Sequence, residues 1–382
     1  MANYDISLID YDIKTNSSLY NDVIMMSETM GICCYYESTG TTGYVESFTL
    51  DASKNITRVE RLAVGSGVIR DPSLVKIDST HFALAHADSA SDGFIKTYSV
   101  TTSGTSINQL DSLEHDVVSG RVNGISLIDS THLYLHYRDG SSDGRVKTFT
   151  LDGSYNITQT DSLVVANNYG ESYNKGLLKF DSSHFIDACQ INSSFHAGVK
   201  VYAYDGSYNL TLTTTSSAFN ANASERFDLK QIDATHFMMV ETSNNKVYAH
   251  TFSVNASTYA VAEIDEIELL DSNTHGCSEY IDGTHMIAGF GNAVAVVTLD
   301  GSYNMTEGSN TTLTGSGEYI KIAKIDDSGN YIVGLAGGGN AHSLQTFNIE
   351  GIGGYPNKVN GVTGFAKLNG VAVGSIAKVN GI

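Results

Sequence analysis

Several features that would point to particular functions are scarce or missing in this chain of 382 residues. Tryptophan is absent and proline occurs twice, whereas glycine occurs 37 times. Thr, Ser, Val, Ile, Tyr and Asn fill the windows between glycines, a composition typical of strands and turns. The four cysteines, Cys33, Cys34, Cys189 and Cys277, lack the spacing of a disulfide framework. We interpret them as small core residues of a chain made in a reducing compartment.

Basic residues are also few. The chain has 22 Lys and Arg against 42 Asp and Glu, a net charge of −20. This charge argues against nucleic acid and anionic membranes as partners, because both require a basic surface. No window approaches 18 uninterrupted apolar residues, so we expect no membrane span. Residues 1–5 have neither a basic nor an apolar segment, so we expect no signal peptide and synthesis in the cytoplasm.

What the chain does contain is a repeat. The sequence Ile-Asp-Ser-Thr-His-Phe at residues 77–82 returns in altered form along the chain, with its Asp at positions 78, 129, 181, 233, 282 and 326. A weaker copy at residues 26–30 precedes these. A second marker, a large apolar residue at positions 48, 98, 149, 202, 252, 297 and 347, repeats in the same register. Seven markers indicate seven units of about 50 residues.

Each unit is predicted to contain four short strands, in the second unit at residues 74–77, 82–86, 94–100 and 107–113. Gly and Asn in the connecting turns, such as residues 152–156, suit hairpins whose backbone takes positive φ. No segment shows a sustained helical period. The sequence therefore predicts an all-β, seven-bladed β-propeller of four-stranded antiparallel blades, with both faces of each blade partly apolar.

The two ends differ from the repeat. The seventh unit lacks a fourth strand, and residues 4–12 alternate like the outer strands of other units, so we expect them to complete the last blade and close the ring. Residues 1–350 then form the propeller, and residues 351–382 form a Gly-rich attachment or assembly tail with three Lys-x-Asn-Gly repeats. The repeated residues are Lys358, Asn360, Gly361, Lys367, Asn369, Gly370, Lys378, Asn380 and Gly381.

The repeated Asp and His could be taken for catalytic partners. They recur in five units, whereas a catalytic pair is needed once, so we interpret them as structural turn residues. The ten residues are Asp78, His81, Asp129, His132, Asp181, His184, Asp233, His236, Asp282 and His285. Residues 88–93 and 139–144 carry two Asp near a Gly, but their spacing favours solvated loops over calcium sites.

Catalysis is not expected. No acid, His or Tyr stands out from the repeat as a catalytic residue, and the sialidase Ser-x-Asp-x-Gly-x-Thr-Trp box is absent. A glycoside hydrolase or lyase is therefore the least favoured function, although a glycosidase needs only two carboxylates and the chain has 42 acids from which such a pair could come. Glycan binding is a stronger alternative, with tyrosines such as Tyr155, Tyr208 and Tyr303 as platforms, although we favour a role in covering the hairpin. We expect neither a cofactor nor a metal.

Two stretches resemble known proteins. Residues 91–97 and 111–116 (Ser-Asp-Gly-Phe-Ile-Lys-Thr and Asp-Ser-Leu-Glu-His-Asp) are similar to propeller repeats of structural proteins of marine bacteriophages and marine bacteria. The Lys-Val-Asn-Gly-Val repeats resemble tails of phage virion and fibre-type proteins. The resemblance implies a non-enzymatic virion structural protein, in a capsid decoration, tail or fibre, that is extracellular after lysis. It implies other virion proteins as partners of the tail and the host surface as a further contact. The alternative is a secreted or surface glycan-binding lectin.

Overall fold

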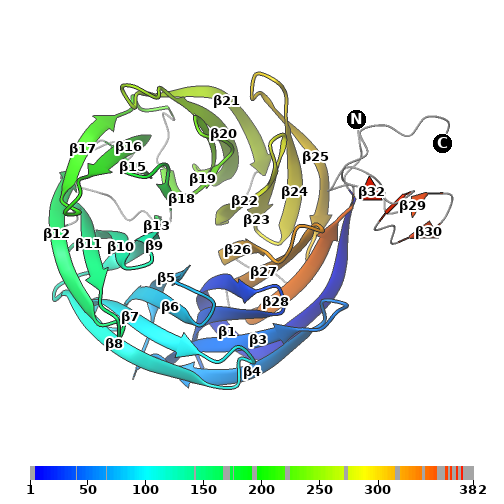
Figure 1. Cartoon of the computed structure of the whole chain (residues 1–382), viewed down its shortest axis with the longest axis horizontal. Helices are drawn as coiled ribbons and strands as arrows, with labels where there is room; N and C mark the ends of the chain where they lie inside the picture. The colour runs from blue at the N-terminus through cyan, green and yellow to red at the C-terminus, as the bar shows by residue number, and fades with distance from the viewer. Residues whose placement is uncertain are drawn as a thin grey trace.

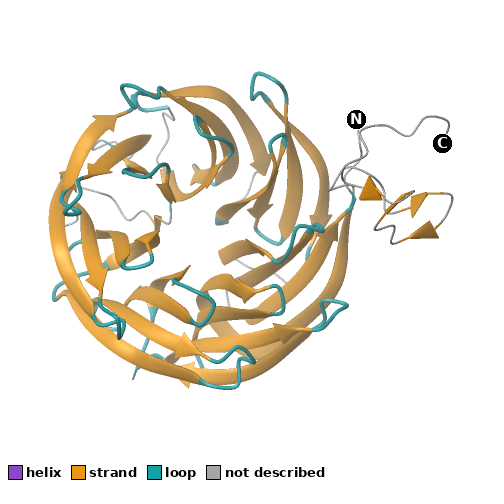
Figure 2. Cartoon of the chain, in the orientation of Figure 1, coloured by secondary structure: helices purple, strands orange, loops and turns teal. Residues whose placement is uncertain are grey.

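The computed structural model describes residues 5–350 apart from 40, 66, 142, 167–172, 175, 192–195, 220–223, 271–273, 315–318 and 338–339, and residues 358–359, 362–363, 367–368 and 371–372 of the tail. Seven four-stranded antiparallel blades stand around one axis (Figure 1). All regular elements of the described residues are strands (Figure 2). The predicted seven-bladed β-propeller is confirmed.

Each blade places its first strand at the axis and its fourth at the rim (Figure 1). Blades 1 to 3 comprise β1 (Ile6–Ser27), β2 (Met30–Glu37), β3 (Thr42–Leu50) and β4 (Ile56–Ala63); β5 (Arg70–Lys76), β6 (His81–Ala87), β7 (Gly93–Val100) and β8 (Ile107–Asp116); and β9 (Arg121–Asp129), β10 (His132–Arg138), β11 (Gly144–Leu151) and β12 (Ile157–Ala166). Blade 4 comprises β14 (Leu177–Lys179), β15 (His184–Gln190), β16 (Ala197–Tyr204) and β17 (Leu210–Thr215).

Blades 5 to 7 continue the same order. They comprise β18 (Ser224–Gln231), β19 (His236–Ser243), β20 (Lys246–Val254) and β21 (Val261–Leu270); β22 (Gly276–Asp282), β23 (His285–Phe290), β24 (Ala293–Leu299) and β25 (Met305–Thr312); and β26 (Tyr319–Lys324), β27 (Asn330–Gly337) and β28 (Asn340–Ile349). The short β13 (Tyr173–Asn174) pairs in parallel with β18 at the axis. The strands predicted for blade 2 are found, but β5 begins four residues earlier than expected, with a register shift between Arg70 and Ser73.

The ring closes through β1. Residues Ile6 to Ile13 pair with β28 as the outer strand of blade 7, and the later part of β1 pairs with β2 as the inner strand of blade 1. The predicted closing strand is thus confirmed, except for residue 4, which lies outside the described residues. It is longer than expected because one unbroken strand serves two blades. This pairing covers the outer edge of β28, which could otherwise pair with another chain.

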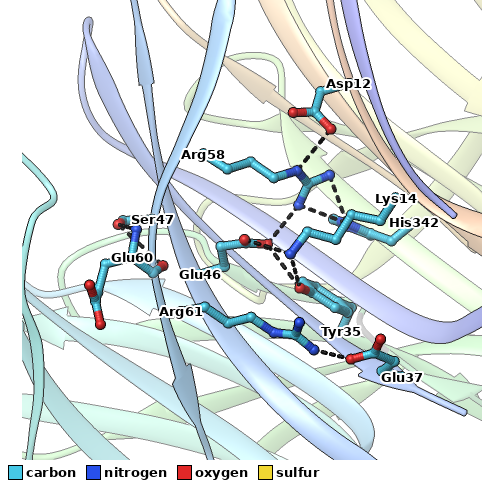
Figure 3. A network of polar contacts seen from close by, with 10 residues as sticks. All are labelled: Asp12, Lys14, Tyr35, Glu37, Glu46, Ser47, Arg58, Glu60, Arg61 and His342. Atoms are coloured by element: carbon cyan, nitrogen blue, oxygen red, sulfur yellow. Dashed lines mark hydrogen bonds and ion pairs between the residues drawn. The ribbon is translucent and has the colours of Figure 1, made fainter. Parts of the chain in front are cut away.

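A polar network ties the closing part of β1 to blade 1 (Figure 3). Lys14 Nζ lies 2.6 Å from Glu46 Oε1, and Arg58 binds both Glu46, at 2.7 Å, and Asp12, at 3.0 Å. The buried Tyr35 donates its hydroxyl to Glu46 at 2.9 Å. Cations and carboxylates from three strands therefore neutralise one another at the closure.

Both faces of each blade are apolar, as predicted. In β6, Phe82 packs in one cluster with blade 1 residues such as Met30, whereas the next residue, Ala83, packs with Leu133 of blade 3. Successive strand side chains point to opposite faces, so a blade between two neighbours must be apolar on both. A fully buried aromatic or aliphatic side chain of this kind contributes about 1.5–3 kcal/mol. The four cysteines are buried.

One expectation about the turns is wrong. Gly and Asn were expected to hold the positive φ in the Asp-Gly-Ser-Tyr-Asn turns, but Tyr155, Tyr208 and Tyr303 do so, at φ 64°, 62° and 63°. In the third unit the Asp152 side chain accepts the amides of Ser154 and Asn156. A tyrosine with positive φ destabilises the fold by about 1–2 kcal/mol, so contacts of its side chain must offset that cost.

The tail forms two short hairpins. β29 (Lys358–Val359) pairs with β30 (Val362–Thr363), and β31 (Lys367–Leu368) pairs with β32 (Val371–Ala372). Lys358 and Lys367 of the predicted tail repeat lie in these strands. The other predicted tail residues, Asn360, Gly361, Asn369, Gly370, Lys378, Asn380 and Gly381, lie outside the described residues. The role of this segment in attachment stays a prediction.

Candidate ligand site on the propeller axis

The inner strands surround a cavity along the propeller axis. Its mouth lies where these strands begin, and it is narrow, with a volume of about 40 Å³. A wider chamber of about 380 Å³ continues toward the ends of the same strands. Asp228 and Lys321 line both parts, so the two are contiguous. The chamber falls in the range of about 300–1,000 Å³ that is usual for small-molecule sites.

One position of the repeat determines the polarity of this cavity. The residue five places before the turn Asp, or before Ser27 in blade 1, lies in the inner strand of each blade or, in blade 4, directly before it. From blade 1 to blade 7 these residues are Asp22, Ser73, Gly124, Gly176, Asp228, Cys277 and Lys321. Because the repeat puts them at one level of the ring, two carboxylates and one ammonium meet near the axis.

Asp228 and Lys321 form the central ion pair. Lys321 Nζ lies 2.5 Å from Asp228 Oδ1, while Asp228 Oδ2 accepts the amide and hydroxyl of Ser278 at 2.7 and 2.9 Å. Burial would lower the pKa of Lys321, but the carboxylates of Asp228 and Asp22 raise it above its usual value. Burial would raise the pKa of Asp228, but Lys321 and Lys230 hold it below its usual value. Both groups are therefore charged at neutral pH.

Similar bonds join neighbouring inner strands. Asp22 Oδ2 accepts the amide of Leu74 at 2.8 Å, and Asp71 Oδ2 accepts the amide of Val122 at 3.1 Å. These carboxylates thus hold adjacent blades together as well as lining the cavity. The Lys321 ammonium, with three N–H donors, can still serve a second acceptor.

Aromatic residues surround the mouth. Tyr319 of β26 contacts Tyr20 of β1 edge-on, with ring centroids 5.1 Å apart, and the His275 ring at 4.0 Å. All three line the narrow part of the cavity, together with Pro72 and Phe227. An apolar rim above a charged interior suits a ligand with one polar end.

The chamber is more basic than the rest of the molecule. Its lining includes four lysines, Lys76, Lys230, Lys321 and Lys324, and three acids, Asp22, Asp228 and Glu279. These side chains sum to +1, in a chain whose net charge is −20. A local cationic excess in a low-dielectric cavity attracts small anions. The arrangement can bind a carboxylate or a phosphate.

The predicted Asp and His turn residues do not line this cavity. Their turns follow the inner strands, at the opposite ends from the mouth. In the second unit the Asp78 carboxylate lies 2.7 Å from the Thr80 amide, 2.9 Å from the His81 amide and 2.9 Å from His81 Nδ1. The same arrangement joins Asp and His in the other four turns.

Four of these turns bind a tyrosine of the next blade, an arrangement that we call the Asp-His-Tyr clasp. In the first, Tyr155 stacks on His81 with ring centroids 3.8 Å apart and donates its hydroxyl to Asp78 at 2.7 Å. The four clasps are Asp78, His81 and Tyr155; Asp129, His132 and Tyr208; Asp181, His184 and Tyr259; and Asp233, His236 and Tyr303. Asp282 and His285 make the turn contact in blade 6, where blade 7 has no third-to-fourth-strand turn to supply a tyrosine.

The clasp explains the strained tyrosines. A hydrogen bond to a charged group contributes about 1.5–3 kcal/mol, and an aromatic pair adds about 0.5–1.5 kcal/mol. Together these match or exceed the cost of positive φ. Partial burial raises the pKa of Asp78. Hydrogen bonds from the Thr80 amide, the Tyr155 hydroxyl and His81 outweigh this effect and lower that pKa to about 2. Each clasp is a contact between blades.

Comparisons with known proteins identify a fold and no family. A scan against family models finds no match, and a search among curated proteins finds none either. A candidate 6-phosphogluconolactonase of Bacteroides fragilis aligns with 78% of this chain and 88% of its own, at 9% identity and a TM-score of 0.58. The periplasmic gluconolactonase of Pseudomonas aeruginosa aligns with 91% and 97%, at 9% identity and a TM-score of 0.56. A chain of the COPII outer coat vertex on membranes aligns with 88% and 85%, at 12% identity and a TM-score of 0.63.

These comparisons overturn the expected function. A non-enzymatic virion structural protein was predicted, whereas the structures that share the fold include lactonases. The prediction is wrong because it came from the repeated sequence, and that sequence specifies the strands and turns of the blades. The expectation of a non-enzyme loses its support for the same reason. At these identities the likeness itself shows the fold alone. No helix long and apolar enough to cross a membrane occurs among the described residues.

Sequence reasoning missed the axial residues. It compared the turns of the seven units but not their inner strands, where Asp22, Asp228 and Lys321 replace the small residues of other blades. The sequence did contain a signal: three units have a charged residue five places before the turn, where the other four units have a small one. The expectation that no acid stands out from the repeat is therefore wrong for Asp22 and Asp228.

Proposed function

We propose that the protein binds a small, anionic, polyhydroxylated molecule of the sugar-acid class in its axial chamber. The observation that carries this proposal is the cationic excess of the chamber lining within a strongly acidic chain. Lys321 supplies a permanently charged donor at the centre, and Lys230 and Lys324 line the wider end. The likeness of the fold to lactonases, whose products are sugar acids, is compatible with this ligand class.

The test is a calorimetric titration of the full chain with D-gluconate, 6-phosphogluconate and, as a neutral analogue, glucitol. We expect the two anions to bind with one site per chain and glucitol to bind at least about tenfold more weakly, since a charged contact is worth roughly 1.5–3 kcal/mol. The variants Lys230→Gln and Lys324→Gln should each weaken anion binding without unfolding the ring. Lys321→Gln should weaken it most, but it also leaves Asp228 without its partner.

The matched control is Lys246→Gln. Lys246 lies on the outer part of blade 5, where its ammonium contacts Glu268 at 2.7 Å, so this variant removes the same charge away from the axis. Equal binding losses in Lys246→Gln and Lys324→Gln would mean that net charge, and not the chamber, governs affinity. Equal affinity for glucitol and gluconate would overturn the proposal.

Hydrolysis of the corresponding sugar lactone is a second candidate, favoured by His275 at the mouth. An imidazole can act as the general base that activates water, and the nearby ammonium of Lys321 can stabilise negative charge on the lactone oxygen. The measurement is acid release from D-glucono-lactone above the uncatalysed rate, in the wild type and in His275→Gln. Release that exceeds the uncatalysed rate equally in the wild type and in His275→Gln would exclude His275 as the base. No release above the uncatalysed rate in the wild type, while gluconate still binds, would refute hydrolysis and leave the binding proposal intact.

A further inference from the structure

Blade 5 departs from the repeat at one buried polar position. In blades 3 and 4 the third strand carries Lys147 and Lys200, whose ammonium groups donate to the carbonyls of His115 and Val165 in the preceding blade. In blade 5 the equivalent residue, which precedes Thr251 and Phe252 as Lys147 precedes Thr148 and Phe149, is His250. Its side chain is completely buried. An imidazole, which can act as a metal ligand, thus replaces an ammonium, which cannot.

A bulge in the outer strand brings two carboxylates to this imidazole. His250 pairs with Glu266, and Phe252 pairs with Glu263, with a register shift between Thr251 and Phe252. Residues three apart in a regular strand face opposite sides, but the extra residue of a bulge returns them to the same side. The same bulge occurs in blade 3, where the equivalent residues are Gln159 and Ser162. Blade 5 therefore differs from blade 3 in chemistry and not in backbone.

Glu241 orients the His250 imidazole as a protein would orient a metal ligand. His250 Nε2 lies 3.2 Å from Oε1 of Glu241, a carboxylate with no exposed surface. His250 Nδ1 points the other way, 2.8 Å from Glu263 Oε1 and 3.7 Å from Glu266 Oε2. The imidazole nitrogen and the two carboxylate oxygens all lie within 4.8 Å of one another. Metal-binding histidines commonly donate their second N–H to a carboxylate in this way, which fixes the ring and its tautomer.

We propose that His250 Nδ1, Glu263 and Glu266 form a site for a divalent transition metal, with Zn²⁺ as the best fit. Glu241 is the positioning residue that holds His250. Zn²⁺ binds nitrogen and oxygen at about 2.0–2.2 Å, which puts tetrahedral ligand atoms roughly 3.3 Å apart, so the three atoms need to shift only by a few tenths of an ångström to about one. Water completes the fourth position, and the proton of His250 Nδ1 leaves to solvent when the metal binds.

Charge also favours a cation here. Glu263 and Glu266 present two carboxylates to one imidazole. In the equivalent niche of blade 1 the central residue is an acid, Glu46, and its outer-strand partners are arginines, so that the charges balance there. A dication would balance the charges in blade 5.

The test uses the full chain, stripped with EDTA, dialysed and titrated with ZnCl₂ by calorimetry. We expect one Zn²⁺ per chain, lost in His250→Gln and weakened at least about tenfold in Glu263→Gln and in Glu266→Gln. Glu241→Gln should weaken binding about 10–100-fold, as for other residues that orient a metal ligand. Co²⁺ should give the visible absorption of a tetrahedral site in the wild type and lose it in Glu263→Gln.

Glu268→Gln is the matched control, because Glu268 lies on the same strand but pairs with Lys246. Its Zn²⁺ affinity should equal that of the wild type. Since Glu263 and Glu266 are exposed, their variants report on binding even if His250→Gln fails to fold. An unchanged stoichiometry and affinity in the Glu263 and Glu266 variants, or an equal loss in Glu268→Gln, would overturn the proposal.

Discussion

The junction that closes the ring and the junctions between repeated blades perform the same task with different contacts. Between blades 3 and 4, Tyr208 stacks on His132 at 3.5 Å and binds Asp129 at 2.7 Å. Between blades 7 and 1, the turn position of that tyrosine holds Lys54, which also has a positive φ, of 65°. Lys54 Nζ binds Asp326 at 2.7 Å, and no imidazole is part of the contact. Aromatic stacking is thus replaced by an ion pair.

The rest of the closing junction is also ionic. Lys14, Glu46, Arg58 and Asp12 form the network shown in Figure 3, at a position where blades 3 and 4 use a lysine and a backbone carbonyl. The closing strand precedes the rest of the ring in the sequence, and it can pair only after its partner β28 has been made. Charge pairs with defined partners help to fix the register of such a strand. We infer that the closing junction is built for specificity and the repeated ones for stability.

The largest effect should come from removing the closing strand. Deletion of residues 1–13 removes the pairing of Ile6 to Ile13 with β28 and the Asp12–Arg58 contact. We expect the melting temperature to fall by about 10 °C or more, because each lost kcal/mol lowers it by a few degrees and several are lost. Deletion of residues 358–382, whose described strands pair in hairpins of their own, is the control. A melting curve unchanged by the first deletion would refute closure by this strand.

Glu46→Gln should have the next largest effect. Glu46 is nearly buried, and its replacement leaves Lys14 and Arg58 without their shared carboxylate. Breaking a buried ion pair on one side costs about 3 kcal/mol, measured as the free energy of unfolding in urea. The exposed pair of Lys246 and Glu268 is the control, and Lys246→Gln should cost less than about 1 kcal/mol. Similar costs for the two variants would mean that the closing network is no more than a surface feature.

A feature of the fold could be predicted from the sequence where it recurs in every unit. The blade count, the closing strand and the turns were predictable because the repeat carries them in every unit and the markers agree in register. The clasp was not, since Tyr208 and His132 lie 76 residues apart and only the ring brings them together. Lys14 and Glu46 were missed for the same reason. The axial residues Asp228 and Lys321 are single exceptions to the repeat, and a search for what recurs passes over them.

Tyr208→Phe tests the repeated junction with a smaller change. It keeps the ring on His132 and removes the hydroxyl that binds Asp129, so we expect a cost of about 1–2 kcal/mol in urea unfolding. Tyr11→Phe, on an exposed residue of the closing strand, should cost nothing measurable. If Tyr208→Phe is also neutral, stacking alone supports the clasp and the hydroxyl is dispensable.

Acid should weaken the repeated junctions through the carboxylates of their clasps. Despite partial burial, bonds from Tyr303, the Thr235 amide and His236 lower the pKa of Asp233 to about 2, and that of Asp78 is about 2 as well. A folded-state pKa below the usual value of about 3.9 gives stability that is present above about pH 4 and disappears as pH falls through 2. The melting temperature should therefore drop between pH 4 and pH 2. A Tyr155→Phe, Tyr303→Phe double variant should show a smaller drop, and an identical drop would show that the tyrosine hydroxyls do not set these pKa values.

The smallest effect, and the sharpest test of the comparison, comes from moving the clasp to the closing junction. In the double variant Lys54→Tyr, Asn330→His, a tyrosine and an imidazole would flank Asp326, in place of the ammonium and of the Asn330 amide that now bonds it at 3.0 Å. Lys54 already has the positive φ that the clasp tyrosines have, so the backbone is prepared for the exchange.

The lost ion pair and the gained stack are each worth about 1 kcal/mol, so we expect the free energy of unfolding to stay within about 1 kcal/mol of the wild type. Its salt dependence should fall, because an ion pair is screened and a stacked ring is not. A loss of several kcal/mol would mean that the geometry of the closing junction, and not only its charges, differs from that of the repeated ones.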